Sequence, residues 1–210
     1  NGLDKQTHSR VMGALTIGKT GTTLRVGYDM LKNYIYLGLQ NQRVADGDNY
    51  LTKGVDVQVR QHGGNVGIFT AQLEQNLQFG ILHWNSRLTY QKSGDEEVIA
   101  LPALNIYTNL FLRFKIARVL QCDLGGDLRW FTKYYAPEYI PGLSTFGMQE
   151  TADSKTKVGG YPLANVYANF NLKHTRFFVM MSHVNASSGG DYFLTPHYPL
   201  NGRIFRFGVS

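Results

Sequence analysis

LNIYTNLFLRFKI, residues 104–116, is the stretch that decides the fold. One set of alternate positions, from Leu104 to Ile116, is apolar apart from Thr108, and the other set is mostly polar. A β-strand places successive side chains on opposite faces, so this alternation predicts a strand with one apolar and one polar face. The stretch has thirteen residues, whereas strands of soluble proteins usually have about five or six. Its length is typical of a strand that crosses a membrane at a tilt.

The same alternation recurs on both sides of this stretch. It predicts about nine strands, at residues 9–17, 22–38, 65–75, 79–91, 103–116, 119–132, 162–173, 175–185 and 203–210. Tight turns alternate with long polar links, the turns near 18–21, 75–78, 117–118 and 174–175 and the links near 39–64, 92–102, 133–161 and 186–202. This layout is that of an outer-membrane barrel, because in lipid only a helix or a closed sheet satisfies its own backbone hydrogen bonds. We therefore predict an all-β fold, an antiparallel transmembrane β-barrel of the outer-membrane type.

The composition argues against several other classes of protein. Charged residues are 17% of the chain, against about 25% in a soluble domain. The longest aliphatic and aromatic run, Phe177–Met181, has five residues, whereas a spanning helix needs about 20. The single Cys122 excludes a disulfide scaffold, and the net charge of +6 is scattered without the basic run that would indicate nucleic acid as a partner. A soluble β-sandwich or lipocalin-like barrel stays open as an alternative, although its strands are shorter and its turns more even.

Six long blocks carry a resemblance to a known family. They are LRVGYDMLKNYIYL (24–37), AQLEQNLQFGILHWNSRLTYQKS (71–93), LPALNIYTNLFLRFKIARVL (101–120), GGDLRWFTKYYAPEYIPGLSTFGMQ (125–149), GGYPLANVYANFNLKHTRFFVMMSHVN (159–185) and YFLTPHYPLNGRIFRFGVS (192–210). Together they resemble the carboxy-terminal half of the putative porin family of Gram-negative outer membranes, found chiefly in Bacteroides-type bacteria. The resemblance implies a β-barrel in the bacterial outer membrane that acts as a passive diffusion pore, with no catalytic residues to carry over.

The number of strands bears on the organisation of the chain. Barrels of this type have an even number of strands, and nine is odd. The chain opens at Asn1 without Met or a signal peptide, and it ends at Ser210 inside an alternating segment. In relatives the last strand continues to an aromatic end. We therefore expect residues 1–210 to be a single β-barrel region, truncated at both ends, that belongs to a larger barrel or assembles with other chains.

The polar face is predicted to line the lumen of a pore. The alternation assigns ten charged residues to it: Arg25, Asp29, Glu74, Arg87, Arg113, Lys115, Asp123, Asp127, Arg129 and Lys173. Six basic against four acidic side chains leave a small positive excess, which predicts a weak preference for anions. Alternatively, opposite charges pair across neighbouring strands and neutralise the wall. The sequence leaves both interpretations open.

Aromatic residues gather near the predicted strand ends, at Tyr34, Tyr36, Tyr90, Trp130, Phe131, Tyr134 and Tyr135. Amphipathic rings favour the lipid headgroup zone, so they predict an aromatic girdle. A sharper hypothesis makes Trp130, Tyr134, Tyr135 and Tyr139 a sugar-stacking platform at the pore mouth. The long link 133–161 is also expected to fold inward as a constriction, since loops of this length are often functional.

Catalysis and metal binding find little support. His83 and His183 each have an Asn two residues further on, but neither has a Ser on its own face, as a hydrolase would need. The other histidines lack metal-ligand spacing. We predict no enzyme activity, no cofactor and no metal. The expected partners are outer-membrane lipid, small hydrophilic solutes or ions, and further copies of the chain or other outer-membrane proteins. The competing hypothesis is a plugged barrel whose surface loops bind a partner.

Overall fold

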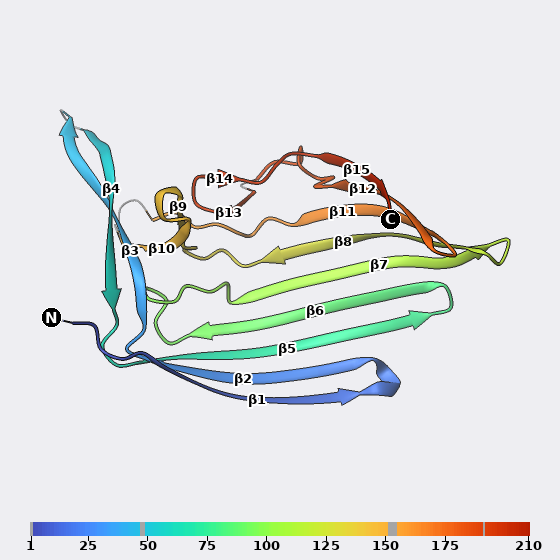
Figure 1. Ribbon diagram of the computed structural model, residues 1–210, viewed down its shortest axis with the longest axis horizontal. Coiled ribbons are helices and arrows are strands. Elements are labelled where there is room, and N and C mark those ends of the chain that lie inside the picture. The colour runs from blue at the N-terminus through green and yellow to red at the C-terminus, as the bar shows by residue number, and fades with distance from the viewer. Residues whose placement is uncertain (1, 47–48, 151–154, 191) are drawn as a thin grey trace.

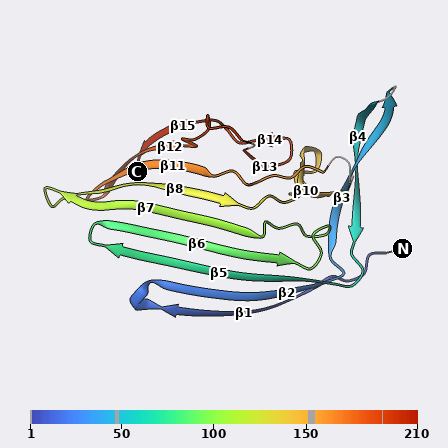
Figure 2. The same ribbon diagram turned by 180° about the vertical axis from the view of Figure 1, so that it is seen from behind.

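A computed structural model describes residues 2–46, 49–150, 155–190 and 192–210, with the backbone alone described within 41–46 and 49–55. Most of the chain forms one sheet of nine strands (Figures 1 and 2). In spatial order these are β1 (Thr7–Ile17), β2 (Thr22–Lys32), β5 (Asn65–Phe79), β6 (Leu82–Ser93), β7 (Leu104–Ile116), β8 (Leu120–Phe131), β11 (Leu163–Leu172), β12 (Thr175–Ser182) and β15 (Ile204–Val209). Every neighbouring pair is antiparallel. The predicted all-β antiparallel class is confirmed.

A second sheet is built from the long links, in the order β4-β3-β10-β9. Its strands are β3 (Ile35–Asp46), β4 (Asn49–Gln61), β9 (Glu138–Ile140) and β10 (Thr145–Gln149). The β3–β4 hairpin follows β2, and β9 and β10 follow β8. The two pieces meet through parallel pairing of β10 with β3, at Met148 opposite Gly38 and Gln149 opposite Leu39. We call these four strands the loop sheet.

The remaining elements are small. The link between β12 and β15 contains a two-stranded sheet of β13 (Phe193–Thr195) and β14 (Tyr198–Pro199). Two single 3₁₀ turns, η1 (Gly18–Thr20) and η2 (Pro141–Leu143), are the helical elements of the described residues. Within those residues, no helix has the length and apolar character needed to cross a membrane.

Several predicted boundaries are wrong, and for two of them the reason lies in the local backbone. The predicted strand 22–38 is divided between β2 and β3, because Asn33 adopts a left-handed φ of 53° that Asn tolerates better than most residues. The link expected at 39–64 therefore holds the rest of the long β3–β4 hairpin. The turn expected at 75–78 is also misplaced, since β5 continues to Phe79 and the chain turns at Gly80, with a φ of 60°. Glycine reaches that φ without steric cost.

In the nine-stranded sheet, many apolar side chains are exposed and some charged side chains are buried. This is the opposite of the arrangement in a soluble protein. Leu110 and Val166, on the apolar face, are 51% and 47% exposed, whereas Asp29 and Asp123, on the polar face, are 5% and 9% exposed. One apolar row runs in register from β5 to β15 through Leu77, Trp84, Leu110, Gly126, Val166, Met181 and Phe205. Water disfavours an exposed apolar belt of this extent, so the belt indicates an apolar environment.

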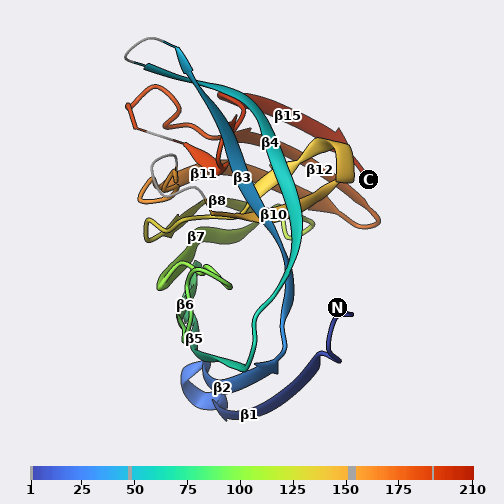
Figure 3. The same ribbon diagram turned by 90° about the vertical axis from the view of Figure 1, so that its left-hand side faces the viewer.

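Short and long connections between the strands lie at opposite ends of the sheet. The short turns lie at one end and the long links with the loop sheet lie at the other (Figure 1). Viewed from the long-link end, the nine-stranded sheet is curved, and β3, β4 and β10 cross in front of it (Figure 3). The loop sheet and the other long links therefore lie together at one end of the nine-stranded sheet.

Candidate functional site

Glu74 is the centre of a charge cluster on the polar face, where the pleat of β2, β5 and β6 brings three predicted residues together. Its Oε2 lies 2.7 Å from Nη1 of Arg25 and its Oε1 lies 2.8 Å from Nε of Arg87, which is directly opposite on β6. Gln72 Nε2 also donates to Oε1, at 2.9 Å. One carboxylate therefore serves two guanidinium groups.

Two further carboxylates pair with cations on the neighbouring strand. Asp29 accepts from Nε of Arg10 at 2.6 Å, and Nε2 of His8 lies at the same distance from the same oxygen. Arg113 donates from Nε and Nη2 to the two oxygens of Asp123, at 2.8 and 2.9 Å, in a bidentate geometry. Pairing across neighbouring strands, the second of our two interpretations, thus describes both of these sites and the Glu74 cluster.

The remaining predicted residues have other surroundings. Asp127 accepts a hydrogen bond from Nδ2 of Asn165 at 2.9 Å. The guanidinium of Arg129 lies 5.3 Å from the ring centre of Tyr107. Lys115 lies near the short-turn end of β7. Lys173, expected in a strand at 162–173, lies in the turn after β11 with a φ of 52°, so that predicted strand was one residue too long at each end.

A cavity of about 740 Å³ lies on the polar face at its long-link end. Its floor is built by strands β5 to β8, and its opposite wall comes from the links that follow β8 and β12. Arg87, Tyr107 and Arg129 stand side by side in register across β6, β7 and β8 and all three line it. Tyr161 and Tyr192 line it from the link side.

His183 fixes the link that carries Tyr192. This residue is 3% exposed, with its Nδ1 lying 2.7 Å from the carbonyl oxygen of Asn201 and its Nε2 lying 2.8 Å from the hydroxyl of Tyr161. The ring of Tyr192 packs edge-on against it, at 5.0 Å between centres. Through these contacts His183 positions the link between β12 and β15. None of these contacts involves a serine. In the part of the chain that the structure describes, no group of His, Cys, Asp and Glu side chains could hold a metal ion.

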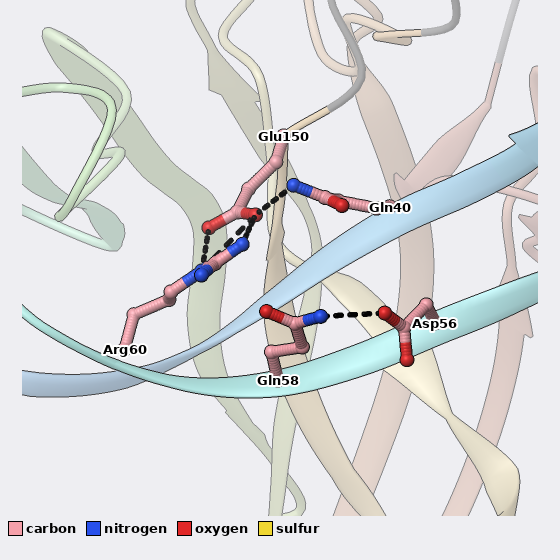
Figure 4. A network of polar contacts seen from close by, with 5 residues as sticks. All are labelled: Gln40, Asp56, Gln58, Arg60 and Glu150. Carbon is pink, nitrogen blue, oxygen red and sulfur yellow. Dashed lines mark hydrogen bonds and ion pairs between the residues drawn. The ribbon is translucent and has the colours of Figure 1, made fainter.

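An ion pair joins the two pieces of the loop sheet (Figure 4). Arg60 on β4 donates from Nε and Nη2 to Glu150, with contacts of 3.1 and 3.0 Å, and Gln40 donates to the same carboxylate at 3.2 Å. The hydrogen bond to Glu150 raises the pKa of Arg60 above its already high ordinary value. Asp56 and Gln58 form a separate contact of 2.7 Å within β4. The Arg60–Glu150 pair holds the β3–β4 hairpin to β10.

Other contacts connect the loop sheet to the neighbouring links. Thr195 donates to the carbonyl of Pro137 at 2.7 Å, and Lys155 forms an ion pair with Glu97. The ring of Tyr139 packs against Phe146 and, edge to face, against Tyr198. The link 133–161 reaches the cavity through Gly159 and Tyr161. The long links therefore form one connected assembly at this end of the sheet.

The structure does not bring together the aromatic platform proposed from the sequence. Trp130 lies on the apolar face, opposite Ile106, while its neighbour Phe131 lies on the polar face and lines the cavity. Tyr135 faces Lys157 instead, whose Nζ is 4.8 Å from the ring centre. Burial raises the pKa of Tyr134 and keeps its phenol neutral. Phe131 is thus a cavity residue and not part of a headgroup girdle.

Sequence reasoning missed most of the residues that form the cavity. Asn105 and Tyr107 were on the correct face in the alternation but, being uncharged, were not selected. A search of the polar face for amides and rings next to arginines would have found them. Tyr192 and Leu200 lie in a link without periodicity, so no pattern in the sequence pointed to them.

Comparisons with known proteins agree with this fold. The chain is similar to part of the siderophore receptor PirA from Acinetobacter baumannii, with a TM-score of 0.54 and 14% sequence identity over 97% of this chain and 31% of the receptor chain. At that identity the similarity concerns the fold alone, and this chain corresponds to less than a third of the receptor's length. No curated protein matches the sequence. A family model described as putative porin matches residues 1–210. Since that match covers the full sequence, the chain belongs to the putative porin family.

Proposed function

We propose that the protein is an outer-membrane porin, a passive diffusion pore for small hydrophilic solutes and ions. The observation that carries this proposal is the inverted exposure of the sheet, with an apolar belt facing outward and a polar face that holds paired charges and a cavity. Outer-membrane barrels have this arrangement because lipid surrounds one face and water fills the other. Lipid would contact the row that contains Leu110 and Val166.

The paired charges favour a pore without strong ion selectivity. Glu74 and Asp123 are each neutralised by arginines from neighbouring strands. Arg129, Lys115 and Lys173 outnumber Asp127, the predicted carboxylate that forms no ion pair with the described residues, and this positive excess supports a weak anion preference. No catalytic role is part of the proposal.

Closure of the sheet requires strands beyond the nine described. β1 and β15 are the edges of the nine-stranded sheet, and lipid offers no hydrogen bonds to an unpaired edge. We propose that further strands of the same protein pair with these edges, with residues 1–210 forming a carboxy-terminal portion of the barrel. A Gram-negative bacterium of the Bacteroides type is the source that the sequence resemblance supports.

Conductance of the full-length protein in a planar lipid bilayer tests the pore. We expect discrete, long-lived steps of current, and a reversal potential under a salt gradient that lies slightly toward the anion side. A clear cation preference would contradict the proposed lumen charge. Release of the protein from membranes by high salt without detergent would contradict the membrane location.

The connected assembly of long links favours a second candidate, a plugged barrel whose loops bind a surface partner. The loop sheet crosses the end of the nine-stranded sheet (Figure 3), and the Arg60–Glu150 pair fixes its halves together. A plugged barrel would insert into the bilayer without a steady current. If Glu150→Gln then produced channel steps, the loop sheet would be the plug.

A further inference from the structure

The charge of the cavity lining has one sign. Arg87 and Arg129 are the charged side chains among the described residues that line it, and no described carboxylate does. Among the described residues, the Arg87 guanidinium hydrogen-bonds only Glu74, through Nε, and its two terminal nitrogens have no hydrogen bond there. Arg129 forms no ion pair with the described residues and lies over the ring of Tyr107. Two guanidinium groups are therefore available to an anion in the cavity.

The spacing of the two arginines suits a ligand larger than a simple anion. They are in register on β6 and β8, with Tyr107 of β7 between them. Neighbouring strands lie about 4.8 Å apart, so the two backbone positions are separated by about 10 Å. A carboxylate can be held by the fork of one guanidinium, while the second reaches another acidic group one sugar ring away.

The rest of the lining has two chemically different walls. On the strand side it presents side-chain amides and a hydroxyl, from Gln72, Gln91, Asn105 and Thr89. On the link side it presents rings and aliphatic groups, among them Phe131, Tyr161 and Tyr192. A sugar ring has hydroxyl groups at its edge for the amides and apolar C–H faces for the aromatic side chains. The volume of about 740 Å³ lies within the range of about 300–1,000 Å³ usual for ligand sites.

We propose that this cavity is a binding site for an acidic saccharide, a short oligomer of sugars that carry carboxylates. Arg87 and Arg129 bind the carboxylates, the amides of β5 to β7 bind the hydroxyls, and the rings from the links pack on the sugar faces. The proposal deepens the proposed function, because it needs the polar face to border an aqueous path. His183 positions the link wall through its contact with Asn201.

Calorimetric titration of the full-length protein in detergent micelles tests the site without depending on conductance. The probes are digalacturonate, neutral cellobiose and inorganic phosphate. We expect saturable binding of digalacturonate, at least about tenfold tighter than that of cellobiose, because hydrogen bonds to charged groups strengthen recognition by about that factor. Phosphate binding as tight as that of digalacturonate would overturn the saccharide assignment, as would equal binding of the two disaccharides.

Charge-neutralising variants localise the binding. Arg129→Gln should weaken digalacturonate binding by about tenfold or more and leave cellobiose unaffected. Arg87→Gln provides a second variant in the same row, so that misfolding of one does not decide the result. Lys115→Gln is the matched control, since it removes one positive charge from the polar face outside the cavity. An equal loss in Lys115→Gln would show a general charge effect and overturn the site.

Bilayer recordings separate this inference from the proposed function. Digalacturonate-dependent interruptions of the current that disappear in Arg129→Gln support both. Calorimetric binding that depends on Arg129, in a protein that gives no current, supports the site and contradicts the open pore. Steady current without preferential binding of digalacturonate supports the pore and overturns the acidic-saccharide site.

Discussion

The nine-stranded sheet is antiparallel throughout, whereas the loop sheet joins two antiparallel pieces through a parallel pairing, so the two sheets are held together differently. In the nine-stranded sheet every strand pairs with a neighbour along nearly its full length, and the apolar face is exposed. The loop sheet depends on two pairs of residues between β10 and β3, and on the Arg60–Glu150 contact. Because lipid offers no hydrogen bonds, the backbone of strands that lie in a membrane must pair within the sheet. Individual side chains decide whether the loop sheet holds together, so substitutions should affect the two regions differently.

The largest difference is expected for an arginine placed on an exposed leucine of each region. Leu110→Arg puts a charge in the middle of the apolar belt and should destabilise the barrel by about 2–4 kcal/mol, the cost measured for charges at the lipid face of barrels. Leu143→Arg, in η2 of the link after β8, should cost less than about 0.5 kcal/mol. The two leucines are 51% and 57% exposed, so exposure alone does not distinguish them. Urea titration of the protein folded in liposomes measures both, and equal effects would mean that the belt is not in lipid.

The next effect concerns the charge cluster of the polar face. Glu74→Gln leaves Arg25 and Arg87 without their shared carboxylate and should cost about 1 kcal/mol, a value reduced because both arginines are partly exposed. Removal of the negative charge should also shift the reversal potential toward anions. Glu97→Gln is the matched control, because its carboxylate is 70% exposed in a link. An equal shift in the two variants would place Glu74 outside the conducting path.

A smaller effect, confined to the loop sheet, is expected from Glu150→Gln. Loss of the ion pair with Arg60 should lower the local opening free energy of the β3–β4 hairpin by about 0.5–1 kcal/mol. Amide hydrogen exchange at residues 35–40 and 56–61 should then accelerate about two- to fivefold, while that of β7 stays unchanged. Asp56→Asn removes a carboxylate of the same hairpin that contacts only Gln58 among the described residues, and it should leave exchange unaltered. Faster exchange in β7 would show that the two sheets unfold together.

The smallest effect is expected at a short turn of the nine-stranded sheet. Arg118 has a φ of 61° in the turn between β7 and β8, a conformation that costs a non-glycine residue energy. Arg118→Gly should therefore stabilise the barrel by about 0.5 kcal/mol, after the greater freedom of glycine in the unfolded chain is deducted. The same change within the strand, Lys115→Gly, should destabilise it by about 0.5–1 kcal/mol. Liposome unfolding curves of the two variants should shift in opposite directions, and a shift in the same direction would contradict the strain at Arg118.

The sequence alone determined the nine strands and the assignment of their faces. The physical reason is that a strand has a period of two, and lipid on one side with water on the other turns that period into an alternation visible over thirteen residues from Leu104 to Ile116. It also placed Glu74 on the same face as the basic residues, although the partners of Glu74 and Arg113 followed only from the register of the strands. Local boundaries were less certain, since a single conformation at Asn33 or Gly80 moves them.

Only the tertiary structure decided what the long links do. The pairing of Met148 with Gly38 and the contact of Arg60 with Glu150 join residues about 90 to 110 positions apart, and no periodicity reports on such a distance. The cavity likewise needs Arg129 from β8 and Tyr192 from the link after β12 to meet. Alternation reflects the environment of one strand, whereas a site formed by loops depends on which segments the curved sheet brings to the same end.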